Sequence, residues 1–157
     1  MLLGIDPLLD GTLLEILDHM GHGDRIAVVD RNYPAFSAER PVVQLGNVST
    51  TRALEAIFSV IPLDVAAASP LTCMADKHGA SRPSHHEVVA LATHRHGVPV
   101  SFELAPRLEF YGLARAVHAV VRTLDDRPYS CFILQKGVIE DPVIEDPVVA
   151  DSSATTR

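Results

Sequence analysis

Apolar residues follow two different spacings along this chain, and together these spacings predict helices that alternate with short strands. Helices are expected where apolar residues recur every three to four positions, and strands where short continuous apolar runs occur. Runs of this continuous kind are typical of strands that helices cover on both faces. The alternation therefore predicts a three-layer α/β/α single domain around one central mixed sheet. The expected helices span residues 12–20, 50–61, 84–96 and 107–116, and the expected strands span 26–30, 42–45, 71–75, 100–104, 117–123 and 129–135.

Polar residues at the ends of these elements predict where helices start and how strands connect. Thr12 with Glu15, and Ser84 with Glu87, have the spacing of a capping box at a helix N-terminus. A polar turn at 125–128 joins the last two expected strands. The short connection predicts that these two strands form an antiparallel hairpin.

The last part of the chain differs in composition from the rest. From residue 138 a Val-Ile-Glu-Asp-Pro motif occurs twice in tandem, and Ser, Thr and Ala dominate the residues that follow. Acidic and low-complexity segments of this kind do not bury enough apolar surface to fold. We therefore expect a folded domain over residues 1–138 and an acidic, disordered tail over 139–157.

Composition narrows the classes of partner and compartment. The chain has 157 residues, 47% of them hydrophobic, and a net charge of −7 without a basic cluster, which argues against nucleic acid or an anionic membrane as partner. No apolar run reaches the length of a membrane span, and the N-terminus lacks the features of a signal peptide, so a cytoplasmic protein is expected. Cys73 and Cys131 lie in apolar runs and are interpreted as reduced buried thiols, in preference to a disulfide or a metal pair.

Common cofactor and nucleophile motifs are absent: the chain has no GxGxxG, P-loop, GxSxG or CxxC sequence. Eight histidines raise the alternative of a metal site. However, His94 with His96, and the adjacent His85 and His86, point to different faces of a predicted helix. The sequence therefore argues against a phosphate-cofactor enzyme and favours solvated helix faces over a metal site for these histidines.

Four residues at the boundaries of expected elements are candidates for chemistry. His22 lies between two glycines after the first helix, either as an uncrowded ligand-facing imidazole or as a group that bonds the last helical carbonyls. Asp30 ends an apolar strand, where ligands bind in α/β sheets, although an aspartate there also caps turns. Arg107 and Tyr129 lie at sheet edges too, with a surface salt bridge and edge packing as their alternatives.

Specific motifs resemble those of the fucose mutarotase/ribose pyranase family. They are Met-Gly-His-Gly-Asp at 20–24 with Asp30 after it, Arg107 with Phe110 and Tyr111 downstream, and Tyr129 leading into Ile-Leu-Gln-Lys-Gly-Val at 133–138. Their order and spacing match over essentially the whole chain before the tail. The arginine and the Lys-Gly-Val ending are more similar to the fucose branch than to the ribose branch.

This resemblance implies a cofactor-free isomerase that interconverts the α and β anomers of L-fucose by opening and reclosing the sugar ring. It also implies a ring-shaped homo-oligomer, often a decamer, with active sites near subunit contacts. D-ribose is the next candidate substrate, in a pyranase reaction. A non-catalytic sugar-binding protein, a metal-dependent hydrolase and a purely structural ring protein are the competing classes.

The resemblance also assigns roles to residues. His22 corresponds to the proton donor, and Asp30, Arg107 and the segment Tyr129, Ser130 and Cys131 correspond to sugar-binding positions. Asp30 would hold a sugar hydroxyl or tune the imidazole. Many members carry Gly or Ala followed by Asn where this chain has Ser130 and Cys131, a departure that bears on which sugar is bound.

Overall fold

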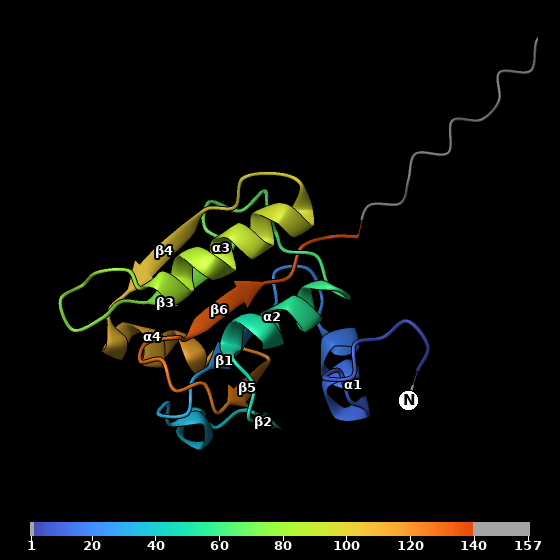
Figure 1. Cartoon of the computed structure of the whole chain (residues 1–157), viewed down its shortest axis with the longest axis horizontal. Coiled ribbons are helices and arrows are strands. Elements are labelled where there is room, and N and C mark those ends of the chain that lie inside the picture. Colours follow the sequence, from blue (N-terminus) through green and yellow to red (C-terminus); the bar gives the residue numbers. More distant parts are fainter. Residues whose placement is uncertain (1, 140–157) are drawn as a thin grey trace, which may run out of the picture.

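The computed structural model of the protein describes residues 2–139, which form one mixed sheet with helices on both faces (Figure 1). This arrangement confirms the predicted three-layer α/β/α architecture. The helices are α1 (Gly11–His19), α2 (Thr50–Phe58), α3 (Pro83–His96) and α4 (Arg107–Ala114), with a 3₁₀ helix η1 (Ala35–Ala38). The strands are β1 (Arg25–Val29), β2 (Val42–Gly46), β3 (Leu71–Met74), β4 (Phe102–Ala105), β5 (Ala119–Thr123) and β6 (Phe132–Gln135).

The order of strands in the sheet is β2-β5-β1-β6-β3-β4, and it contradicts the predicted hairpin between the last two strands. Strand β1 lies between β5 and β6, parallel to the first and antiparallel to the second. Because β1 is apolar on both faces, it is stabilised most by a central position with a strand on each side. Residues 124–131 cross the end of β1 to reach β6, a step of two strand spacings, or about 10 Å.

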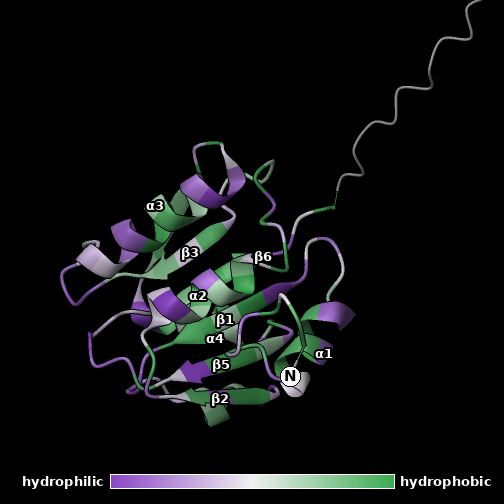
Figure 2. Cartoon of the chain, turned by 45° about the vertical axis from the view of Figure 1, so that its right-hand side comes forward, coloured by the Kyte–Doolittle hydropathy of each residue, from purple (hydrophilic) through white to green (hydrophobic). Residues whose placement is uncertain are grey.

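Strand β1 also shows why helices must cover both faces of the sheet. Ile26 and Val28 belong to the core beneath α1, α2 and α3, whereas Ala27 and Val29 belong to the core beneath α4 and η1. Successive residues of a strand point to opposite faces, so a continuous apolar run needs cover on each. Figure 2 shows the middle of the sheet as largely hydrophobic, with hydrophilic residues on the outer sides of α2 and α3.

The helix starts differ from those that the capping pattern predicts. Asp10 caps α1 and accepts the N–H of Leu13 at 2.8 Å, so Thr12 lies inside the helix. Helix α3 starts at Pro83, so Ser84 is in its first turn instead of at its cap. Proline suits the first helical position because the N–H that it lacks has no helical partner there. Both predicted capping boxes are therefore wrong, although the helices themselves are present.

The two cysteines are free and buried, as predicted: Cys73 lies in the core on one face of the sheet and Cys131 in the core on the other. Over residues 2–139, no helix combines the length and apolar character needed to cross a bilayer. The expected tail lies, from residue 140 onward, outside the described residues. The domain boundary at residue 138 stays a prediction.

Candidate functional site

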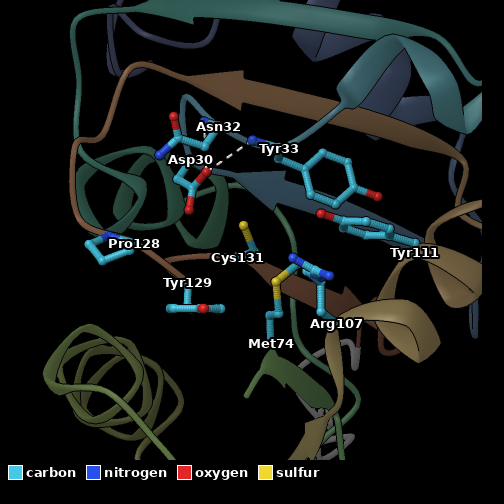
Figure 3. Close-up of a pocket in the computed structure, with 9 residues that line it drawn as sticks. All are labelled: Asp30, Asn32, Tyr33, Met74, Arg107, Tyr111, Pro128, Tyr129 and Cys131. Carbon is cyan, nitrogen blue, oxygen red and sulfur yellow. Dashed lines mark hydrogen bonds between the residues drawn. The ribbon is translucent and has the colours of Figure 1, made fainter. Parts of the chain in front are cut away.

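A cavity of about 260 Å³ opens at one edge of the sheet (Figure 3). Strands β1 and β3 end at this edge, β4 ends there and leads into α4, and the antiparallel β6 begins there. The crevice beyond the carboxyl ends of parallel strands is the usual ligand site of an open α/β sheet. The cavity is near the lower end of ligand-pocket volumes, roughly 300 Å³, and therefore suits a small molecule. Its lining residues are Asp30, Asn32, Tyr33, Met74, Arg107, Tyr111, Pro128, Tyr129 and Cys131.

Asp30 caps the turn after β1, one of the two roles considered for it from the sequence, and it also lines the cavity. Its Oδ1 accepts the backbone N–H groups of Asn32 at 2.9 Å and Tyr33 at 3.1 Å, which caps the turn after β1. The Cys131 thiol lies within hydrogen-bonding reach of the same carboxylate. Asp30 is 4% exposed and lines the cavity, so its carboxylate can accept a further hydrogen bond from a ligand.

Arg107 contributes a cation to the opposite side of the same cavity (Figure 3). It is the first residue of α4, and its guanidinium forms no hydrogen bond or salt bridge with residues 2–139, so the surface salt bridge considered from the sequence is not found there. A guanidinium with unused donors is well suited to bind sugar oxygens. The structure therefore brings Arg107 and Asp30 to one site.

Tyr111 lines this cavity as well, although the residue-by-residue reasoning did not single it out. It lies one turn after Arg107 on α4, and residues four apart share a helix face. That spacing is the signal that could have identified it. Burial raises the pKa of its phenol, an effect that the charge of Arg107 opposes. The hydroxyl is therefore protonated at neutral pH and can donate a hydrogen bond.

The segment from Tyr129 to Cys131 is a loop before β6, not the first part of a strand as predicted. Tyr129 and Cys131 line the cavity, whereas Ser130 does not. The Ser130 side chain is buried, and its hydroxyl lies 2.5 Å from that of Thr50 on α2. Burial and the nearby charge of Asp30 raise the pKa of the Cys131 thiol well above its usual value. Cys131 therefore lines the cavity as a neutral thiol.

His22 lies at the other edge of the sheet, away from this cavity. It precedes β1, whereas Asp30 follows β1. The chain between Asp24 and Asp30 is largely extended, and at about 3.3 Å per residue it separates the two ends by about 20 Å. Within one chain, His22 therefore contacts none of the other predicted site residues, and Asp30 does not tune its imidazole.

The partner of His22 is Asp64, which sequence reasoning missed. The Nε2 of His22 lies 3.2 Å from the Oδ2 of Asp64, and Gln135 donates to the same oxygen at 2.9 Å. The hydrogen bond from Gln135, followed by that from His22, lowers the pKa of Asp64. Asp64 lies next to His22 because its neighbour Leu63 pairs with Lys136 at the end of the sheet. No local sequence pattern predicts this pairing.

The alternative role of His22 as a helix cap is filled by another residue. The ammonium of Lys136 donates to the carbonyl of Met20, at the end of α1. The His22 side chain is instead 58% exposed. Since a carboxylate only accepts, Asp64 holds the proton of the neutral imidazole on Nε2 and leaves Nδ1 as a free acceptor. His22 thus presents an acid–base group on the surface.

The remaining histidines do not assemble into a metal site. Among residues 2–139, no group of three His, Cys, Asp or Glu side chains is arranged to hold a metal ion. His85 nevertheless departs from the predicted solvated face, because it belongs to the first turn of α3 and is fully buried there. Its partners are the backbone N–H of Arg82 and the carbonyl of Tyr129, not other ligand-type side chains.

Comparison with known proteins gives a consistent result over almost the whole described chain. An L-fucose mutarotase from Glaesserella parasuis serovar 5 (strain SH0165) is 35% identical over 141 residues, which cover 88% of this chain and 96% of the relative. The crystal structure of the fucose mutarotase from Streptococcus pneumoniae in complex with L-fucose is 28% identical, with a TM-score of 0.81 over 88% of this chain and 100% of that chain. Bacillus subtilis RbsD complexed with D-ribose shares the fold, with a TM-score of 0.70, 20% identity, and coverage of 84% of this chain and 95% of that chain. The model of the RbsD/FucU transport protein family matches residues 3–139, and the chain therefore belongs to the RbsD/FucU family, as its motifs suggested.

Proposed function

We propose that this protein is a mutarotase that interconverts the α and β anomers of L-fucose by acid–base catalysis and without a cofactor. The observation that carries the proposal is the cavity in which Asp30, Arg107 and Tyr129 meet, in a chain whose curated relatives are named L-fucose mutarotases. The cavity joins an anionic acceptor, a cationic donor and phenols, and a sugar presents both donors and acceptors on every face.

The reaction needs only proton transfers around one C–O bond. A base removes the proton of the anomeric hydroxyl while an acid protonates the ring oxygen, and the bond between the anomeric carbon and the ring oxygen breaks to give an aldehyde. Rotation about the first C–C bond and reclosure on either face exchange the anomers, and every proton is returned. A group with a pKa near neutrality can act in both directions, and such help accelerates a reaction by roughly 10²–10⁴-fold.

The residues of the cavity would bind and orient the sugar. The carboxylate of Asp30 would accept from one sugar hydroxyl, and Arg107 would donate to another sugar oxygen on the opposite side. The phenols of Tyr111 and Tyr129 would supply further polar contacts, while the Cys131 thiol would form part of the cavity wall. Ser130 would act through its backbone, because its hydroxyl is bonded to another side chain.

We further propose that the protein assembles into a ring-like homo-oligomer, on the decameric pattern that the resemblance implies, in which His22 of one subunit completes the cavity of another. The exposed imidazole and its separation from Asp30 support this arrangement. Apolar side chains near the cavity support it too: Phe36 is 65% exposed and Leu108 is 75% exposed. Burial of these two side chains at a subunit contact would stabilise such an assembly.

The test is the rate of exchange between the α and β anomers, measured by saturation-transfer NMR with L-fucose and with D-ribose. We expect faster exchange for L-fucose, and a loss of roughly 100-fold or more in His22→Ala. Acceleration for ribose alone would assign the chain to the pyranase reaction instead. Binding of L-fucose without acceleration would leave a sugar-binding protein, and neither binding nor acceleration would reject the proposal.

A further inference from the structure

Tyr129 has a backbone conformation that is unusual for a residue with a side chain. Its φ is +62°, in the left-handed region, and Glu39 is the one other non-glycine residue with positive φ in the part of the chain that the structure describes. Such conformations cost about 1–3 kcal/mol and persist only where the surroundings hold them. Because the ring of Tyr129 lines the cavity, its conformation matters for the site.

The segment that carries Tyr129 is held by three elements in turn. The imidazole of His85 on α3 bonds the carbonyl of Tyr129 at 2.8 Å. The next residue, Ser130, is held by Thr50 on α2, and the carbonyl of Cys131 accepts the N–H of Met74 at the end of β3 at 3.0 Å. Of these contacts, the one from His85 acts on the residue in the left-handed conformation itself.

The hydrogen-bond partners of His85 determine which of its two ring nitrogens carries the proton. Its Nδ1 lies 3.0 Å from the backbone N–H of Arg82, which can only donate, so Nδ1 is an acceptor. The proton of the neutral ring is therefore on Nε2 and is donated to the carbonyl of Tyr129. The ring is fully buried and meets Phe132 edge-on, with centroids 5.6 Å apart. Burial lowers the pKa of His85, which favours the same neutral form.

We propose that His85 is a positioning residue for the sugar site: its Nε2–H holds the carbonyl of Tyr129, and thereby keeps the Tyr129 ring in the cavity. The inference rests on the proposed function, because it assigns His85 a role in sugar binding. Without this donor the Tyr129 carbonyl loses its hydrogen bond, and the loop relaxes toward negative φ to find another. The relaxation turns the ring away from the sugar. A glycine would adopt the same φ without strain, but it would supply no ring.

The decisive variant is His85→Phe, which keeps a buried ring against Phe132 but removes both hydrogen bonds. We expect the KM for L-fucose to rise about tenfold, with kcat changed far less, since a lost binding contact of this type is worth about one order of magnitude. His85→Gln, whose amide can donate to the same carbonyl, should recover most of the affinity. The matched control is His86→Phe on the same turn, because His86 is exposed and bonds Ser81 instead.

A double-mutant cycle separates positioning from a general effect on the fold. In a Tyr129→Ala background the ring is already absent, so adding His85→Phe should raise KM by less than about twofold. If the two substitutions multiply, His85 acts independently of the Tyr129 ring and the proposal is wrong. An unchanged KM in His85→Phe alone would also overturn it.

Wild-type protein supplies a test that does not depend on any variant folding or on activity. The ¹⁵N shifts of the His85 ring should show a protonated Nε2 and an unprotonated Nδ1, with Tyr129 backbone shifts typical of positive φ. The opposite tautomer would overturn the proposal. If the protein neither binds nor converts L-fucose, the proposed function fails and the sugar role of His85 fails with it. The ring shifts would still report separately on the His85–Tyr129 hydrogen bond.

Discussion

Two inactive variants of this protein should restore one another when they form mixed oligomers. The first variant is His22→Ala, which removes the acid–base group. The second combines Asp30→Asn with Arg107→Ala, which removes both charges of the cavity. Both should fold: His22 and Arg107 are exposed, and an asparagine at position 30 can still cap the turn through its amide oxygen.

The expected recovery follows from the geometry. Asp24 and Asp30, which flank β1, lie about 20 Å apart, so no side chain of one chain spans from His22 to the cavity that Asp30 lines. If each site combines His22 of one subunit with the cavity of another, random mixing in equal amounts leaves roughly one quarter of the sites intact. Each parent alone should retain about 1% or less of the wild-type rate.

The assay uses co-expressed variants with two different tags, purified through both tags so that every particle is mixed. Exchange between the anomers of L-fucose is then measured by saturation-transfer NMR at equal protein concentration. A rate near one quarter of wild type supports shared sites. A rate equal to the mean of the two parents would refute them, because His22 would then act within its own chain or not at all.

Further predictions concern binding, stability and thiol reactivity. Arg107→Met should weaken L-fucose binding about tenfold in calorimetry. It should not lower the melting temperature, because the guanidinium has no partner within residues 2–139. An unchanged affinity would show that Arg107 does not bind the sugar. Hydrogen bonds from Arg127 and Thr50 outweigh the effect of burial and hold the pKa of Asp125 well below the ordinary aspartate value of about 4, so its contribution to stability is complete above that pH and declines as the pH falls below it. Asp125→Asn should therefore lose about 2 kcal/mol in urea unfolding at pH 7 and show a weaker acid dependence, and equal curves for both proteins would contradict this. Cys73 and Cys131 are buried, with burial raising both pKa values, so mass spectrometry should find them alkylated by iodoacetamide only after unfolding.

The sequence was sufficient for the architecture wherever a local pattern decides the outcome. Continuous apolar runs predicted buried strands, and β1 is buried on both faces as that pattern requires. The pairing of β5 with β6 was not predicted correctly, because hairpin signals are local whereas strand order depends on which strand gains most from the centre of the sheet. The predicted helix caps were wrong for a related reason. Asp10 and Pro83 determine where α1 and α3 start, and the capping-box spacing further along the chain does not.

For the site, the sequence identified residues at the ends of strands, but it did not predict which of them lie close together in the folded chain. Asp30 and Arg107 meet because parallel strands end at one edge, which a topological rule anticipates. Asp64 and His85 could not be found in this way. Each acts through a contact more than 40 residues away in sequence, Asp64 with His22 and His85 with Tyr129. Their type and local surroundings alone favour a surface carboxylate and a solvated histidine.

The same strand places the two halves of the proposed chemistry. β1 carries the proposed acid–base residue before its first position and the proposed sugar-binding carboxylate after its last, and Ile26–Val29 between them are fully buried. A strand packed on both faces does not bend to bring its ends together, because bending would expose both cores. Its register is equally fixed, since a shift of one residue would exchange the side chains of the two faces. The rigidity that separates His22 from Asp30 within a chain therefore also fixes both groups relative to the surfaces of the subunit. Rigid placement of this kind is what a site shared between identical subunits requires, since neither subunit can adjust to an imprecise neighbour.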